Sequence, residues 1–200
     1  MAYSAEMPGT TSFVKQMENE LVAFVNGRVR GVTDQTLYIF NRDGSARFAG
    51  HVFRKGVDMS PHHDAIKTKR GTFMVLMQKY SVDGDFRDDI VVELDGKGEI
   101  LWTMSINQLI FGEPFGAKDL AWGENWMHTN SLSEFSNGDL LISARNHNQL
   151  LRVTYPDKEV IWSKGEGQLG FQHHATIDGN FIYVYNLLKS VIPNSTPFES

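Results

Sequence analysis

A repeated arrangement of hairpins is the feature that most limits how this chain of 200 residues can fold. Three segments share one pattern, in which a strand-like stretch, an Asp-bearing turn and a second strand-like stretch follow one another. They are Tyr38–Phe48, Val92–Trp102 and Arg152–Trp162. Self-similar hairpins at regular intervals are typical of repeat proteins, in which each unit packs on its neighbours.

A polar opening led by histidine precedes each of three further strand-like stretches. The openings are His62-His63-Asp64, His128-Thr129-Asn130 and His173-His174-Ala175, which lead to Gly71–Met77, Gly138–Ser143 and Gly179–Tyr185. Each repeat therefore combines an opening, a hairpin and a second hairpin. Units of four antiparallel strands and about 40 to 65 residues are the blades of β-propellers.

Short runs of Val, Ile, Leu, Phe and Tyr between turn residues predict an all-β chain. Helical periodicity is found only around Phe13–Leu21, and weakly. Tight connections are predicted at Asn41–Gly44, Asp95–Gly98, Ser136–Asp139 and Asp178–Asn180. The expected strands are Leu21–Val25, Thr36–Phe40, Phe73–Met77, Asp89–Leu94, Ile100–Met104, Asp139–Ala144, Leu150–Thr154, Val160–Ser163 and Asn180–Asn186.

The repeats amount to about three blades and the opening of a fourth. A propeller blade buries both faces only between neighbouring blades, so a ring must close. We therefore expect this sequence to be part of a larger propeller, or to close by association with another copy through exposed blade edges. The expected division is an N-terminal segment, flexible or helical, over residues 1–20, blades over 21–186 and an irregular tail over 187–200.

Composition excludes several classes of function. The net charge is −5, and the 19 Lys and Arg residues are scattered, so a nucleic-acid partner is not expected. The absence of cysteine excludes disulfides, thiolate zinc sites and Cys nucleophiles. No apolar run approaches the roughly 18 residues of a membrane span. The first twenty residues lack the features of a secretory signal, and the compartment is left open.

The histidines carry the functional argument. Equivalent positions of propeller blades surround one axis, so His62, His128 and His173 form one candidate cluster, joined by Asn130 and Arg145. A single histidine before a strand is more often structural, but recurrence in three repeats favours a site. Asp64 beside two histidines leaves a metal-dependent hydrolase open, although no HxH or HExxH spacing supports it.

These motifs together resemble the arylsulfotransferase family, the PAPS-independent aryl-sulfate sulfotransferases built on a six-bladed propeller. The resemblance covers about Phe53 to Asn186. Family members are longer, usually exported, and have further blades on both sides of the matching region. The motifs that carry the resemblance are His62–Asp64, Trp126–Ser131, Asn137–Arg145, Ile161-Trp162 and Gln172–Ala175.

The resemblance implies a reaction and a set of roles. A histidine attacks the sulfur of an aryl sulfate, releases a phenol and forms a sulfohistidine, from which a phenolic acceptor takes the sulfuryl group. His173 matches the nucleophile, and His128, Asn130 and Arg145 match the residues that hold the sulfuryl group.

His62 matches a further site histidine by repeat alignment, while His63 stays a candidate. His63 and His174 are assigned to substrate binding. No metal or cofactor is required. The alternative is a non-catalytic propeller fragment or binding module of the same family.

Overall fold

The computed structural model describes residues 11–29, 32–50, 53–54, 57–80, 87–112 and 127–187. The chain divides into two compact units, residues 1–106 and 107–200. The first ten residues and most of the expected tail, residues 188–200, lie outside the described part.

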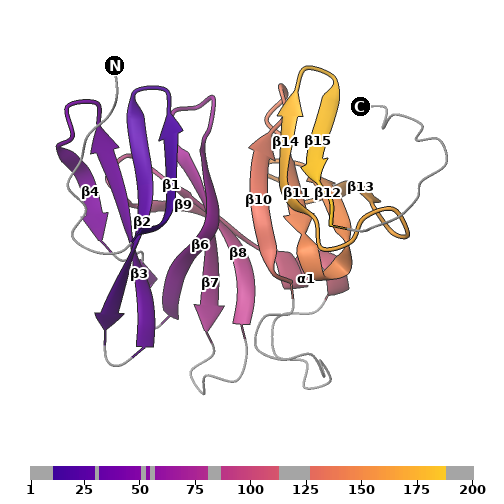
Figure 1. Cartoon of the computed structure of the whole chain (residues 1–200), viewed down its shortest axis with the longest axis horizontal. Helices are drawn as coiled ribbons and strands as arrows, with labels where there is room; N and C mark the ends of the chain where they lie inside the picture. The colour runs from indigo at the N-terminus through magenta and orange to yellow at the C-terminus, as the bar shows by residue number, and fades with distance from the viewer. Residues whose placement is uncertain are drawn as a thin grey trace. The chain divides into compact units, whose positions relative to one another are not determined.

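Unit 1 contains two antiparallel sheets, whose strands follow one another in chain order (Figure 1). The strands of the first sheet are β1 (Thr11–Met17), β2 (Glu20–Val29), β3 (Val32–Asn41) and β4 (Ala46–Gly50). The strands of the second are β5 (Phe53–Arg54), β6 (Val57–Lys67), β7 (Phe73–Tyr80), β8 (Arg87–Leu94) and β9 (Ile100–Ser105).

Unit 2 contains one four-stranded antiparallel sheet and one two-stranded sheet. The first comprises β10 (Thr129–Glu134), β11 (Leu140–Ala144), β12 (Gln149–Val153) and β13 (Val160–Lys164), and the second β14 (His173–Asp178) and β15 (Phe181–Tyr185). The helical elements are α1 (Ile106–Phe111) and the 3₁₀ turn η1 (Arg145–His147). Within the described ranges, no helix has the length and apolarity needed to cross a membrane.

The all-β class is confirmed, and the antiparallel sheets have the form of propeller blades. All nine expected strands are present. The three His-led openings lie within or directly at the start of strands, β6, β10 and β14, with His128 just before the first residue of β10. Hydrophobicity did not reveal them because buried polar residues such as Ser60, Thr129 and Ser131 occupy inward positions, where alternation predicts apolar ones.

The helical periodicity over Phe13–Leu21 is a wrong prediction. This stretch forms β1 and the start of β2, which pair through a turn at Glu18-Asn19. Phe13 and Met17 face the core, and the Phe13 ring stacks on Phe24 with centroids 4.4 Å apart. Pairing with β2 and burial of these side chains override a weak local preference for helix.

One turn geometry recurs four times in the described part of the chain. In each turn the first residue donates its backbone N–H to the fifth and accepts a hydrogen bond from a glycine in fourth place. Each of these glycines has positive φ, as in a type I turn followed by a left-handed residue. The turns are Asn41–Ser45, Thr68–Thr72, Asp95–Glu99 and Phe135–Asp139.

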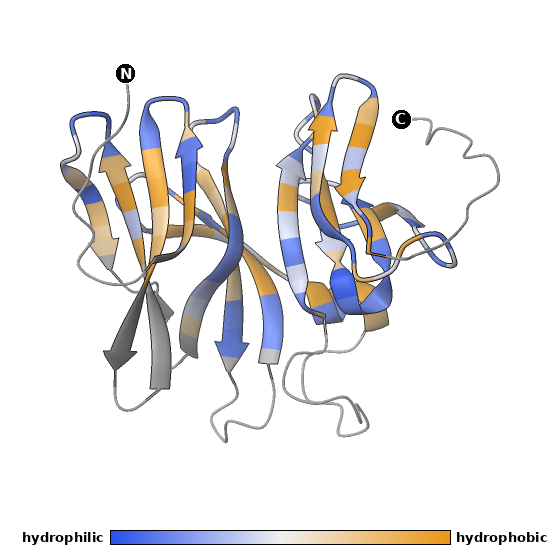
Figure 2. Cartoon of the chain, viewed as in Figure 1, coloured by the Kyte–Doolittle hydropathy of each residue, from blue (hydrophilic) through white to orange (hydrophobic). Residues whose placement is uncertain are grey.

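Each unit buries its core between two neighbouring sheets. In unit 1, Phe24 and Leu37 of the first sheet share one apolar cluster with Phe73 and Val92 of the second. In unit 2, Leu141 and Leu150 share a cluster with Ala175 of the two-stranded sheet. Hydrophobic and hydrophilic residues alternate along many of the strands (Figure 2). This sheet-on-sheet packing is the way that propeller blades bury their faces.

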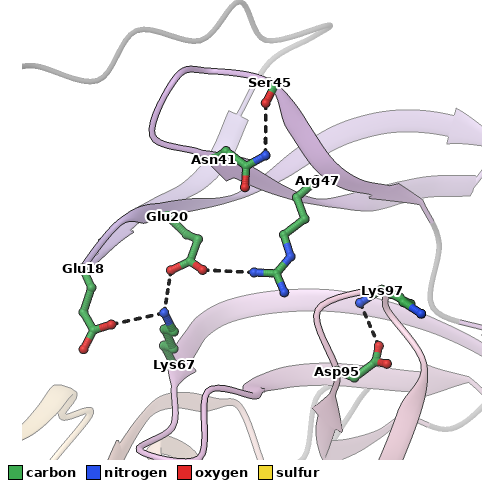
Figure 3. A network of polar contacts seen from close by, with 8 residues as sticks. All are labelled: Glu18, Glu20, Asn41, Ser45, Arg47, Lys67, Asp95 and Lys97. Carbon is green, nitrogen blue, oxygen red and sulfur yellow. Dashed lines mark hydrogen bonds and ion pairs between the residues drawn. The ribbon is translucent and has the colours of Figure 1, made fainter.

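An ion-pair network also joins the two sheets of unit 1 (Figure 3). Glu20, at the start of β2, accepts hydrogen bonds from Arg47 Nη1 at 3.1 Å and Lys67 Nζ at 2.7 Å. Lys67 ends β6 and also contacts Glu18 Oε2 at 3.1 Å. The hydrogen bond to Glu20 is the main reason that the pKa of Lys67 is raised.

Two turn glycines provide a matched test of this packing. Gly98 and Gly71 have φ of 84° and 81°, but a Cβ on Gly98 would overlap the Phe48 ring, whereas one on Gly71 meets nothing within 4 Å. Gly71→Ala should cost about 1–2 kcal/mol, from backbone strain alone. Gly98→Ala should cost about 1–3 kcal/mol more, because Phe48 packs against the core.

Urea unfolding of the full chain measures both losses. Equal losses in the two variants would contradict the close contact between the β8–β9 turn and β4.

Candidate functional site

Each opening strand departs from regular sheet geometry at or next to its histidines. The pairing register shifts between Pro61 and Ala65 in β6, between Thr129 and Ser131 in β10 and between His173 and Thr176 in β14. His63, His128 and His174 have φ of 57°, 47° and 55°. Non-glycine residues rarely adopt this conformation, and bulges redirect side chains next to functional sites.

In unit 1, His62 and His63 form a contacting pair. Their Nδ1 atoms are 2.8 Å apart, so one nitrogen donates and the other accepts. His62 is buried, and its Nε2 lies 3.6 Å from Oδ1 of the buried Asp89 on β8. His63 is exposed. The pair thus connects a buried carboxylate to an imidazole at the surface.

The acidic residue of the same opening, Asp64, has a role within unit 1. Its Oδ1 accepts hydrogen bonds from Lys15 Nζ at 2.7 Å and from the backbone N–H of Ala65 at 2.8 Å. The bond from Lys15 joins β6 to β1 of the first sheet. Across the part of the chain that the structure describes, no three His, Cys, Asp or Glu side chains are grouped as a metal site.

In unit 2, a backbone carbonyl orients the imidazole of His173. The His173 Nδ1 lies 2.8 Å from the carbonyl oxygen of Phe171. Because a carbonyl oxygen can only accept, Nδ1 must carry the proton of this hydrogen bond. In the neutral ring, Nε2 then holds the lone pair.

Arg145 lies at the end of β11, where the 3₁₀ turn begins. Its backbone N–H donates to the His128 carbonyl at 3.4 Å, and its guanidinium carbon lies 4.9 Å from the centre of the Phe171 ring. Nη1 donates to Asn146 Oδ1 at 3.2 Å, while the buried Nε has no partner among the described residues. Since a guanidinium carries five N–H donors and Asn146 accepts one from Nη1, donor capacity is left for an anion.

Asn130 and Gln172 join the two sheets of unit 2 at the same place. Asn130 Nδ2 donates to the Gln172 carbonyl at 2.7 Å. Gln172 Nε2 lies 3.1 Å from the Ala144 carbonyl and 3.0 Å from that of Gln149. Both side chains are buried, and their oxygens have no hydrogen-bond partner within the described ranges.

The structure thus brings four of the expected residues into one connected arrangement. Asn130 contacts Gln172, Arg145 and His173 both contact Phe171, and the His128 carbonyl accepts the backbone N–H of Arg145. His174, which follows His173 in β14, is exposed. His62 and His63 belong to unit 1.

Sequence reasoning missed Asp89, Asn148, Phe171 and the bonding role of Gln172. In the sequence, Gln172 stands out only as the first residue of the motif Gln172–Ala175, and Phe171 directly precedes it. Asn148 has no sequence signal that separates it from an ordinary turn residue, since its contact with Phe171 joins positions 23 apart.

The chain is similar to known proteins over most of its length. The family model described as Arylsulfotransferase (ASST) matches residues 6–180. A protein of unknown function from Bacteroides caccae, solved by crystallography, is similar with 14% identity and a TM-score of 0.46, over 92% of this chain and 73% of that chain. No curated protein matches the sequence.

One titration in unit 2 should affect stability. Burial lowers the pKa of His147 from its ordinary 6.5, because the half-buried ring is charged less readily in the folded state. The unfolded chain therefore binds more protons, and stability must fall as the pH drops through 6.5. His147→Gln should reduce this fall.

Urea unfolding of both proteins at about pH 8 and about pH 5.5 measures the effect. An equal loss of stability in the two proteins would exclude a contribution from His147.

Proposed function

Because this chain belongs to the arylsulfotransferase family, we propose that it transfers a sulfuryl group from an aryl sulfate to a phenolic acceptor through His173. The observation that supports this most directly is the hydrogen bond from His173 Nδ1 to the Phe171 carbonyl. It leaves the lone pair on Nε2, as a nucleophile requires.

Transfer takes place in two displacements at sulfur. In the first, the Nε2 lone pair forms an N–S bond while the S–O bond to the aryl group breaks, and the phenolate leaves with the electron pair. In the second, the acceptor oxygen forms an S–O bond, and the N–S bond breaks to return the pair to Nε2. Neither step calls for a metal or a nucleotide.

Arg145 and Asn130 are the proposed binding groups for the sulfuryl oxygens. The Arg145 guanidinium is a permanent planar cation with unused donors, and it matches two oxygens in a fork. Asn130 is held by its bond to the Gln172 carbonyl, next to His173 in the chain. A pre-oriented cation stabilises the charge that develops on the sulfuryl group during transfer.

The remaining histidines are assigned to proton transfer and substrate contact. The departing phenolate needs a proton, and the acceptor phenol must lose one. A side chain that transfers these protons typically raises the rate by about 10²–10⁴-fold. We propose His128 for this proton transfer, because its backbone carbonyl is bonded to the N–H of Arg145. His62 and His63 are further candidates, since their shared hydrogen bond lets a proton pass between them. His174 is proposed to contact substrate.

Replacing His173 should abolish transfer. Release of 4-nitrophenol from 4-nitrophenyl sulfate, with phenol as acceptor, should fall at least about 10³-fold in His173→Ala and His173→Asn. The asparagine variant is the sharper test, because its amide N–H can still donate to the Phe171 carbonyl while Nε2 is lost. Wild-type protein incubated with the donor alone should gain an acid-labile sulfuryl group on His173.

Matched circular dichroism spectra are the control for folding. Release that persists in both variants, or an adduct on another residue, would contradict His173 as the nucleophile. A folded wild-type chain that gives neither release nor adduct would favour the alternative, a non-catalytic binding module of the same family.

Arg145→Lys tests the paired guanidinium donors separately from the positive charge. Lysine keeps the positive charge but loses the planar pair of donors, so kcat should fall about 10²-fold. Arg152→Lys is the matched control, because Arg152 bonds to Asp139 at 2.9 Å and stacks on Phe135 away from this arrangement. Equal kcat in the two variants would argue against a specific role for Arg145.

A further inference from the structure

Phe171 has a backbone conformation that is costly for a residue of its kind. Its φ is 50°, in the left-handed region that glycine adopts freely and a side chain with a Cβ does not. The preceding residue is Gly170, so the chain places phenylalanine at the left-handed position although a glycine lies directly before it. Strained residues of this kind persist where surrounding contacts hold them, and they cluster at functional sites.

A specific contact holds Phe171 in this conformation. The Phe171 backbone N–H donates to Asn148 Oδ1 at 3.0 Å. Asn148 is itself left-handed, with φ of 54°, and its N–H donates to the Arg145 carbonyl at 3.0 Å. The turn that begins at Arg145 therefore holds the backbone of Phe171, although the two lie far apart in sequence.

Phe171 in turn contacts both groups that the proposed reaction uses. Its carbonyl accepts the His173 Nδ1 hydrogen bond, and its ring lies under the Arg145 guanidinium. Phe171 as a whole residue is nevertheless 55% exposed, so core packing does not account for its position. A cation over an aromatic face is attracted by the ring and keeps a defined orientation.

We propose that Phe171 is a positioning residue that sets the His173 tautomer and the Arg145 orientation together. The proposal rests on the proposed function, because it assigns Phe171 to the same site. Its left-handed backbone aims the carbonyl at Nδ1, and its ring supports the guanidinium plane. The hydrogen bond from the Phe171 N–H to Asn148 Oδ1 maintains both contacts. The nucleophile His173 and the cation Arg145 are therefore both positioned by Phe171.

Nuclear magnetic resonance of the full chain tests the two contacts without any need for activity. In the wild type at a pH where imidazole is neutral, ¹⁵N spectra should show the His173 proton on Nδ1. Asn148→Gly keeps the left-handed backbone but deletes the acceptor for the Phe171 N–H, and should yield a mixture of tautomers. Phe171→Leu should leave the tautomer unchanged but broaden or shift the Arg145 Nε–H signal.

Kinetics tests the consequence, with Phe181→Leu as the matched control. Phe181 is 59% exposed on β15 of the same unit, and its ring contacts Tyr183. Phe171→Leu should lower kcat about tenfold, with a smaller change in KM, because the cation acts on charge that develops in the transition state. Phe171→Trp should restore kcat to within about threefold, since it restores the aromatic face. Phe181→Leu should change neither constant.

The outcomes separate this inference from the proposed function. An inactive wild type that still shows the Nδ1 tautomer, and loses it in Asn148→Gly, would support the positioning and reject the sulfuryl transfer. An active wild type whose kcat and NMR signals are unchanged in Phe171→Leu and Asn148→Gly would overturn the positioning. Equal losses of kcat in Phe171→Leu and Phe181→Leu would overturn it too.

Discussion

An antiparallel sheet with apolar residues on its faces must be covered, and each compact unit meets this requirement by packing one sheet on another. The cores of both units lie between such sheets, formed by Phe24 and Phe73 in one case and by Leu141 and Ala175 in the other. Burial of apolar area is the dominant stabilising term in such packing. Every other feature, including the candidate site, is positioned by it.

The same packing brings the opening strands β10 and β14 of unit 2 together. In unit 2, β14 is bonded to β10 through side chains: the Ala175 N–H donates to Ser131 Oγ at 2.8 Å, and Asn130 bonds to the Gln172 carbonyl. Polar groups buried at this junction must be hydrogen-bonded. The bonds that satisfy them also bring His173 and Arg145 to the ends of neighbouring strands.

Much of the fold could be predicted because local chemistry specifies it. Alternating apolar residues and turns such as Asp95–Glu99 indicate hairpins within a few residues of sequence. The opening strands could not be found in this way, since their inward residues are polar. The helical pattern over Phe13–Leu21 failed because it depended on a weak local preference, whereas pairing and packing with distant residues decide the outcome.

For the candidate site, the sequence by itself determined that histidine recurs at the openings, which gave the candidates His128 and His173, and that Arg145 ends the strand after the second opening. Only the tertiary structure decided how these side chains are held. The bond from Phe171 to Asn148 spans 23 positions, and the His173 Nδ1 is bonded to the Phe171 carbonyl two positions before it. Side-chain orientation follows from contacts between strands that are remote in sequence, and no local pattern encodes such contacts.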